Sequence, residues 1–147
     1  MATDIRTFTL ALDKVIENIP IDANMFKRHV ALDLLTRVVE KTPVDTGRAR
    51  ANWQVSVSSP SAQEIQYRST EPIAAQMNES SIAGATIEKG SKVIDTVEIG
   101  EDIWLHNNLP YIEVLENGRV GNKGSEQAPN GMVALSVAEV EEGFTRI

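Results

Sequence analysis

The chain has 147 residues, of which 41% are hydrophobic and 24% are charged, and it contains no cysteine. This length suits one domain, and the composition is that of a globular protein rather than of a disordered or membrane-spanning chain. The lack of cysteine excludes a disulfide framework, a thiolate nucleophile and cysteine-ligated zinc, and it fits a chain made in a reducing cytoplasm. We therefore expect a single domain over residues 1–147, without a secretory signal.

The charge of the chain is acidic, with 14 Lys and Arg against 21 Asp and Glu and a net charge of −7. Proteins that bind the phosphate backbone usually present a basic face, because their affinity comes from the release of condensed counterions. The basic residues here are scattered along the chain. This distribution argues against direct binding to nucleic acid.

Residues 4–41 predict two helices. An apolar stripe marks the first helix and ends at Pro20, and its members are Leu10, Leu12, Val15, Ile16 and Ile19. Asp22 is the expected N-cap of the second helix, since its carboxylate can accept a free N–H of the first turn. Apolar residues at spacings of three and four mark one face of this second helix, which ends before Pro43. They are Phe26, Val30, Leu34, Leu35, Val38 and Val39.

The middle of the chain predicts strands on both sides of one helix. Residues 53–58 alternate apolar and polar side chains, which is the pattern of a half-buried strand. Residues 64–68 alternate again after a turn, so we expect the two segments to form an antiparallel hairpin. A helix is expected over residues 72–88, followed by strands over residues 93–99 and 103–105.

The last third of the chain predicts a short element, a loop and a helix. Residues 110–118 are expected to form a helical turn or a strand edge, and residues 118–126 a flexible glycine-rich loop. A C-terminal helix follows, with an apolar face formed by Met132, Leu135, Val140 and Phe144. Because helices and strands do not alternate as strict βαβ units, the order predicts an α+β fold with N-terminal helices, a mostly antiparallel sheet and a C-terminal helix.

No catalytic motif is present, since the chain has no phosphate-binding loop, no GxSxG and no GxGxxG. Neither His29 nor His106 has a partner at the spacing of a catalytic or metal site. Acidic residues cluster twice without the pattern of a calcium loop, so we interpret both clusters as solvated surface. They are Asp95, Glu98, Glu101 and Asp102, and then Glu113 and Glu116. We therefore expect no enzyme, no metal and no cofactor.

Two alternatives stay open outside this interpretation. A small metal-dependent cytoplasmic hydrolase would use carboxylate oxygens, which are hard ligands for divalent cations, together with one imidazole. Its candidate residues are Glu98, Asp102, Glu113 and His106. An acidic mimic of DNA would need carboxylates in regular rows, whereas the sequence has clusters.

Three segments are rich in residues that define turns or carry polar side chains. They cover residues 42–53, 105–118 and 127–133. In the first, a proline ends a helix and a glycine can supply a positive φ before the strand begins. The residues of interest are Asp45, Gly47, Arg48, Arg50 and Trp53 in the first segment, Asn107, Asn108, Pro110, Tyr111, Glu116 and Gly118 in the second, with Arg119 directly after it, and Gln127, Pro129 and Gly131 in the third.

The three segments read VDTGRxRxxW, NNxPYxxxLExG and QAPxGMV, in that order. This set resembles the neck and tail-completion proteins of tailed bacteriophages, the lambdoid tail-component family that includes the minor tail protein Z type. The resemblance extends over about residues 22–140. Each motif alone is short, and their order and spacing make the resemblance specific.

The resemblance implies a structural protein of the virion, assembled in the host cytoplasm, that forms a ring at the head–tail junction and helps to join the DNA-filled head to the tail. Its partners would be copies of itself, the adaptor or portal-side proteins, and the tail terminator or tube proteins, with no membrane involved. DNA would pass through the lumen without specific binding, and an acidic wall would suit this because like charges repel. The alternative within the virion is a tail terminator that caps the tail tube.

The resemblance also suggests roles for individual residues. The first segment would form a helix-to-strand corner in which Arg48 or Arg50 pairs with a carboxylate such as that of Glu116. The second would form a turn whose side chains bond to nearby backbone, through Asn107, Asn108 and Pro110. Residues 127–132 would be either an interface or a cap on the C-terminal helix. The aromatic residues expected in the core are Trp53, Trp104 and Tyr111.

Overall fold

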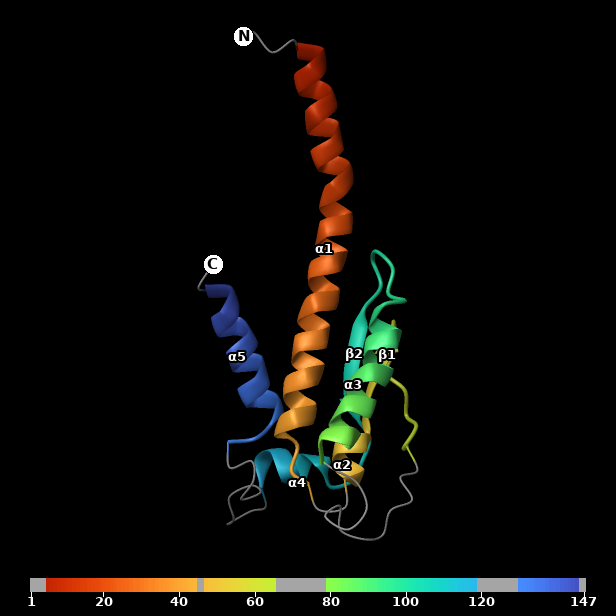
Figure 1. The fold of residues 1–147 in the computed structure, drawn as a ribbon, viewed down its shortest axis with the longest axis vertical. Coiled ribbons are helices and arrows are strands. Elements are labelled where there is room, and N and C mark those ends of the chain that lie inside the picture. Colours follow the sequence, from red (N-terminus) through yellow and green to blue (C-terminus); the bar gives the residue numbers. More distant parts are fainter. Residues whose placement is uncertain (1–4, 45–46, 66–78, 119–129, 146–147) are drawn as a thin grey trace.

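A computed structural model describes residues 5–44, 47–65, 79–118 and 130–145 (Figure 1). Within these ranges the chain forms helices and strands in the order α1 (Ile5–Lys41), α2 (Arg48–Ala51), β1 (Trp53–Val57), α3 (Glu79–Ile94), β2 (Ile103–Asn107), α4 (Ile112–Asn117) and α5 (Val133–Thr145). The predicted α+β class is confirmed, since a long N-terminal helix and a C-terminal helix accompany a two-stranded antiparallel sheet.

The N-terminal region is one continuous helix, so the prediction of two helices separated at Pro20 is wrong. α1 has 37 residues and Pro20 lies inside it. A proline removes one intrahelical hydrogen bond and costs a helix interior about 3 kcal/mol. The residues on both sides keep their helical conformation, and the helix continues through this position. Asp22 is therefore an interior residue of α1 and not an N-cap.

β1 pairs with β2, which follows α3 in the chain. In the antiparallel register Trp53 lies opposite Asn107 and Val57 lies opposite Ile103. The predicted strand over residues 53–58 is confirmed as β1, and that over 103–105 is confirmed and extends to Asn107. Of the predicted hairpin partner over residues 64–68, the structure describes residues 64 and 65, and neither lies in a strand. Residues 66–68 lie outside the described part of the chain.

Side-chain amides bond to the backbone of residues 61–65, which follow β1 and are not in a strand. Asn52 donates from Nδ2 to the carbonyl oxygen of Ile65 at 3.1 Å and accepts the Ile65 N–H at 2.8 Å. Asn108 donates from Nδ2 to the carbonyl oxygens of Ser61 at 2.7 Å and Gln63 at 2.8 Å. These bonds satisfy backbone groups that a neighbouring strand would otherwise pair.

α3 confirms the predicted helix where the chain is described, and residues 72–78 of that prediction lie outside. The helix continues to Ile94, so the predicted strand over residues 93–99 is wrong. Turns follow the helix instead, with the Val97 N–H bonding to the carbonyl of Ile94 at 3.1 Å. The sheet and α1 approach α3 closely at Gly90, where an added Cβ would lie 2.9 Å from Cγ2 of Val55.

The core lies where the C-terminal half of α1 meets α3, the sheet and the start of α5. Fully buried side chains include Leu35, Val39, Ile94 and Met132. Trp53 is buried as predicted, with 7% of its surface exposed. This part of the molecule forms one end of the structure in Figure 1.

Two aromatic residues expected in the core are exposed, Trp104 by 43% and Tyr111 by 38%. Trp104 alternates along β2 with Ile103 and Leu105, which pack against the core. Since successive side chains of a strand point to opposite faces, Trp104 is directed away from the core. Tyr111 directly precedes α4, outside the core. The prediction for both residues is wrong.

The N-terminal half of α1 projects beyond the other elements (Figure 1). Every residue from 11 to 23 is exposed, including Leu12 by 46% and Ile16 by 56%. Within the described residues, no helix combines the length and the apolar character needed to cross a membrane. About half of the surface of each large apolar side chain between residues 11 and 23 is open to solvent, and these side chains are Leu12, Val15, Ile16, Ile19 and Ile21.

Candidate functional site

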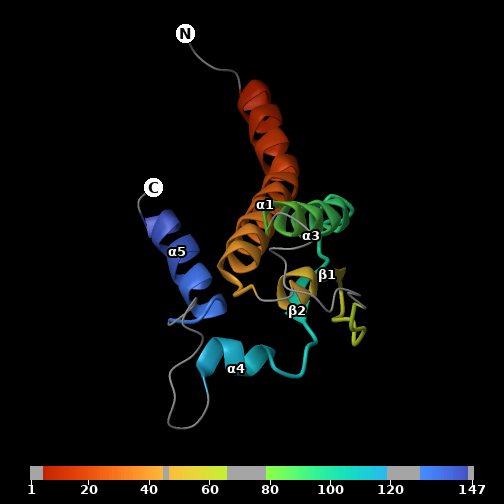
Figure 2. The ribbon, with the colours of Figure 1, turned by 60° about the horizontal axis from the view of Figure 1, so that its bottom comes forward.

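The three sequence segments meet at one end of the molecule, where α1 ends and α4 lies beside the start of α5 (Figure 2). The first and second segments join through the sheet, and Asn107 also donates from Nδ2 to the carbonyl of Ala49 at 2.8 Å. The second and third join through Glu116, which accepts backbone N–H groups at the start of α5. Segments far apart in sequence thus form one structural unit, which we call the three-segment junction.

The first segment forms a tight corner between α1 and β1. Gly47 has a φ of +83° and is buried, so a side chain would be strained at this position. Arg50 is buried, and its Nη2 donates to the carbonyl oxygens of Glu40 and Thr42, at 3.0 Å each. One carbonyl lies in the last turn of α1 and the other directly after it, so the guanidinium stabilises the negative end of that helix. Asp45 lies outside the described residues.

Arg48 forms an ion pair, as predicted, but its partner is not the predicted carboxylate of Glu116. Its Nη2 pairs with Oε1 of Glu64, and this hydrogen bond raises the pKa of Arg48. The expected partner, Glu116, instead accepts bonds from backbone N–H groups. The prediction of an arginine pair at the corner is confirmed, and its assignment to Glu116 is wrong.

Trp53 joins the corner to α1 through a buried hydrogen bond. Its Nε1 donates to Oγ1 of Thr42 at 2.7 Å, and that hydroxyl donates in turn to the carbonyl of Val38 at 2.5 Å. Thr42 is 1% exposed. A buried tryptophan N–H needs such a partner, because an unsatisfied polar group costs about 1–3 kcal/mol when buried.

The second segment contains the predicted turn followed by a short helix. The side chain of Asn107 accepts the N–H of Leu109 at 3.2 Å, as a local turn requires. Asn108 and the Nδ2 of Asn107 bond to more distant backbone, so the predicted local bonding is confirmed only for Oδ1 of Asn107. Pro110 lies in the turn before α4, which confirms a helical turn as the right alternative for residues 110–118.

Glu116 is the central side chain of the junction. Its Oε2 accepts the N–H groups of Met132 at 2.7 Å and Val133 at 2.9 Å, and Oε1 accepts that of Ala134 at 2.9 Å. Burial by itself raises the pKa of this carboxyl, but the three backbone hydrogen bonds together outweigh burial and lower it. Glu116 therefore caps α5 as a carboxylate, at the end where the helix dipole favours negative charge.

Gly131 makes this cap possible. Its φ is +78°, and an added Cβ would lie 2.7 Å from Oε1 of Glu116. Of the two interpretations of residues 127–132, the helix cap is supported for the described residues. Gly118, with a φ of +75°, ends α4.

The rest of the loop between α4 and α5 is not described. Arg119, Gln127 and Pro129 lie outside the described residues, as does the predicted glycine-rich loop after Gly118.

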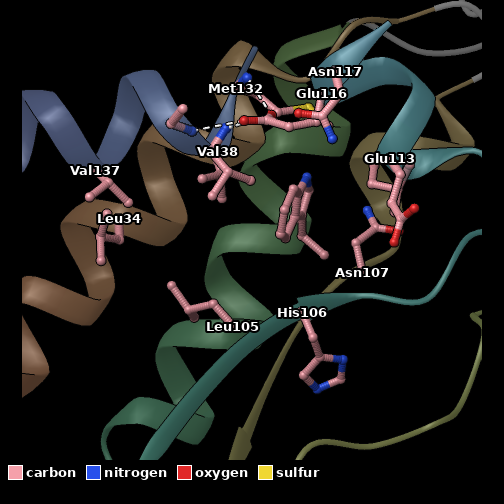
Figure 3. A pocket seen from close by; sticks show the side chains of 14 residues that line it. Leu34, Val38, Leu105, His106, Asn107, Glu113, Glu116, Asn117, Met132 and Val137 are labelled. Carbon is pink, nitrogen blue, oxygen red and sulfur yellow. Dashed lines mark hydrogen bonds between the residues drawn. The ribbon is translucent and has the colours of Figure 1, made fainter. Parts of the chain in front are cut away.

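A pocket of about 610 Å³ opens beside the three-segment junction, between α1, β2, α4 and α5 (Figure 3). Apolar side chains dominate its lining, with Leu34, Val38, Leu105 and Val137 among them. Glu116 lies at its edge with both oxygens directed at the start of α5. The pocket thus offers an apolar surface, and the Glu116 carboxylate at its edge already holds the start of α5.

His106 also acts in a structural bond. Its Nε2 lies 3.1 Å from Oγ of Ser56 and accepts the N–H of Ser61 at 3.4 Å. Burial lowers the pKa of His106, and a hydrogen bond with Asn108 offsets this only in part, so the neutral imidazole is favoured. A neutral ring that accepts a backbone N–H matches the interpretation of His106 as a structural histidine.

The candidate ligands of a metal-dependent hydrolase are not brought together. Among the described residues, no group of three or more His, Asp or Glu side chains could hold a metal ion. Glu98 and Asp102 flank the turn before β2, whereas Glu113 is on α4 at the other end of the strand. His106 lies near that end, without a carboxylate of this set as its hydrogen-bond partner.

Sequence reasoning did not single out three residues that hold this region together. Asn52 is fully buried and bonds to Ile65, and Thr42 links Trp53 to α1. Glu139 on α5 accepts hydrogen bonds from Arg37 at 2.7 Å and Lys41 at 2.8 Å. The single signal in the sequence for the last contact is the i, i+4 spacing of two basic residues on α1.

Comparison of the chain with models of protein families, with curated proteins and with solved structures finds no match.

Proposed function

We propose that the chain is a structural subunit of the head–tail junction of a tailed bacteriophage, a neck or tail-completion protein that works by binding protein neighbours in a ring. The observation that carries the proposal is the exposed apolar surface of the projecting half of α1. Leu12, Val15, Ile16 and Ile19 are 46–57% exposed on a helix that extends beyond the rest of the fold. Contiguous apolar surface of this kind marks a binding surface, because its removal from water favours association.

The three-segment junction supports a structural role. Its polar side chains act within the fold, since Arg50 stabilises the end of α1 and Glu116 caps α5. Glu116 and His106 both have hydrogen-bond partners in the protein. The three segments that carry the resemblance thus stabilise the fold. The projecting half of α1 would supply the surface that binds neighbouring proteins.

The acidity of the chain fits a ring around passing DNA. With 21 acidic against 14 basic residues, each copy would add negative charge to the assembly. Like charge keeps a phosphate backbone from binding to a wall without any specific contact.

The proposal is tested by removing the chain from the phage whose genome encodes it. A stop codon early in its gene, with the wild-type chain supplied in trans as the control, should yield filled heads and separate tails that fail to join. Cross-linking in complete particles should then connect the chain to a head-side adaptor. Cross-links confined to the major tube protein would indicate a tail terminator, and normal infectious particles without the chain would contradict a structural role.

A further inference from the structure

Six apolar residues of α1, exposed except for the half-buried Val30, follow one side of the helix with the spacing of a coiled coil, while the exposed Ile21 and Met25 lie on the opposite side. Along the chain the six residues follow at alternating intervals of four and three residues, as Leu12, Ile16, Ile19, Ala23, Phe26 and Val30. This 3.5-residue period over three heptads forms a single seam, and such seams pair with a second helix. Pro20 lies beside the seam rather than in it.

The seam continues into an apolar groove on the body of the same molecule. Beyond Asn24 the helix is held by the turn before β2, where Asn24 and Lys27 donate to the carbonyls of Val97 at 3.1 Å and Glu101 at 2.5 Å. Here Phe26 and Val30 line a groove of about 740 Å³, which β2 and α5 border through residues including Trp104 and Phe144. The rings of Phe26 and Phe144 lie 5.3 Å apart.

We propose that, before it assembles with other proteins, the chain forms a two-fold dimer in which the α1 helices of two copies pair antiparallel along this seam. The projecting half and the groove lie on one face of one helix, so a second copy turned end to end covers both. Each copy's projecting half then fills the groove of the other, which is the reciprocal arrangement that two-fold symmetry requires.

One register aligns the seam residues of the two copies and pairs one set of opposite charges, against a single like-charge contact between the two Asp22 side chains at the two-fold axis. With Leu12 opposite Val30 of the second copy, Ile16 faces Phe26 and Ile19 faces Ala23 across the interface. The same register places Asp13 beside Lys27 of the second copy, an opposite-charge pair at flanking positions. Lys27 uses one donor on Glu101, and an ammonium group has three.

A parallel pair fits the structure less well. It would place both bodies at the same level, where the groove walls on β2 and α5 stand on either side of the seam. The antiparallel pair separates the bodies along the helix axis. Residues 11–23 of each copy, about 20 Å of helix, then become buried instead of exposed.

The dimer is tested first by sedimentation equilibrium of the full chain. Ile16→Asp places a charge in the seam and should raise the dimer dissociation constant by about tenfold or more. Ile21→Asp is the matched control, because Ile21 is 49% exposed and lies on the opposite side of α1. Both variants should keep the wild-type circular dichroism spectrum, since both positions are exposed in the single chain. Equal masses for the two variants, or a wild-type monomer at high micromolar concentration, would overturn the proposal.

The direction of pairing is tested with spin labels on single introduced cysteines, which are unique because the chain has none. In the proposed register, position 22 lies close to its copy across the two-fold axis. Position 14 lies opposite position 28, so labels at Lys14→Cys should be separated by roughly 20 Å more along the helix axis than labels at Asp22→Cys. Equal short distances at both positions would show a parallel pair and contradict the proposal.

This inference concerns the free chain, whereas the proposed function concerns the assembled particle. The two fail separately: a monomeric chain that is still required for joining heads to tails would refute only the dimer. A dimer formed by a chain that particles do not need would refute only the proposed function.

Discussion

The carboxylate of Glu116 lies directly over the backbone of Gly131, so that an added Cβ at residue 131 would be 2.7 Å from Oε1. From this position the carboxylate accepts the first three N–H groups of the α5 region, those of Met132, Val133 and Ala134. A glutamate in one segment and a glycine in another thus form a single helix cap. This contact couples the second and third segments.

Gly131→Ala should lower the free energy of unfolding by about 1–3 kcal/mol. The substitution combines the strain of a positive φ with a steric clash against the carboxylate. Gly143→Ala in α5 is the control, because a Cβ there meets no atom within 4 Å. Urea unfolding should separate the two variants. Equal stabilities would show that Glu116 moves aside freely.

Acidification should remove the contribution of Glu116. The pKa of this carboxyl is lowered in the folded chain, so its stabilisation is present above the ordinary glutamate pKa of about 4.3 and is lost as the pH falls through the folded value. Glu116→Gln should cost about 1–2 kcal/mol at pH 7. The difference between wild type and variant, measured by urea unfolding, should shrink below pH 4. A difference independent of pH would contradict the charged cap.

Two glycines of α3 should respond to alanine in opposite directions. At Gly90 a Cβ would lie 2.9 Å from Val55 and closer still to the Leu35 side chain, so Gly90→Ala should destabilise the fold by about 1–3 kcal/mol. At Gly84 the space is open, and Gly84→Ala should stabilise the helix by about 0.5–1 kcal/mol. Thermal unfolding of both variants checks the packing of α3 on α1. Stabilisation by both would contradict it.

The two arginines of the corner should differ in importance. Arg50→Ala removes a buried guanidinium from the carbonyls of Glu40 and Thr42 and should cost about 2–3 kcal/mol. Arg48→Ala removes an ion pair in which the arginine side chain is 41% exposed and should change stability little. Chemical denaturation distinguishes them, and a larger loss for Arg48→Ala would reverse this assignment.

The elements with strong local patterns were predictable. The alternation in β1 and the apolar face of α5 both mark elements that the structure contains. The break expected at Pro20 was wrong because a proline weakens a helix without always ending it. The pairing of β1 with β2 could not be predicted locally, since 45 residues separate Val57 at the end of β1 from Ile103 at the start of β2, and tertiary contacts bring the two strands together.

The sequence was enough to predict which residues form the three-segment junction, but not which of them contact one another. The three segments contain Gly47, Arg50 and Glu116, which all define the three-segment junction. Which carboxylate meets which donor depends on the packing of α4 against α5, and no local pattern encodes this. Trp104 shows the same limit, because its exposure follows from which face of the sheet meets the core.

The most direct measurement is quantitative mass spectrometry of purified particles of the phage that encodes this chain, calibrated with labelled peptides of its own sequence. The account predicts a small fixed number of copies in each particle, in a multiple of three or six, as a ring at the junction requires. Abundant chain in the infected cell and none in the particle would contradict a structural role in the virion.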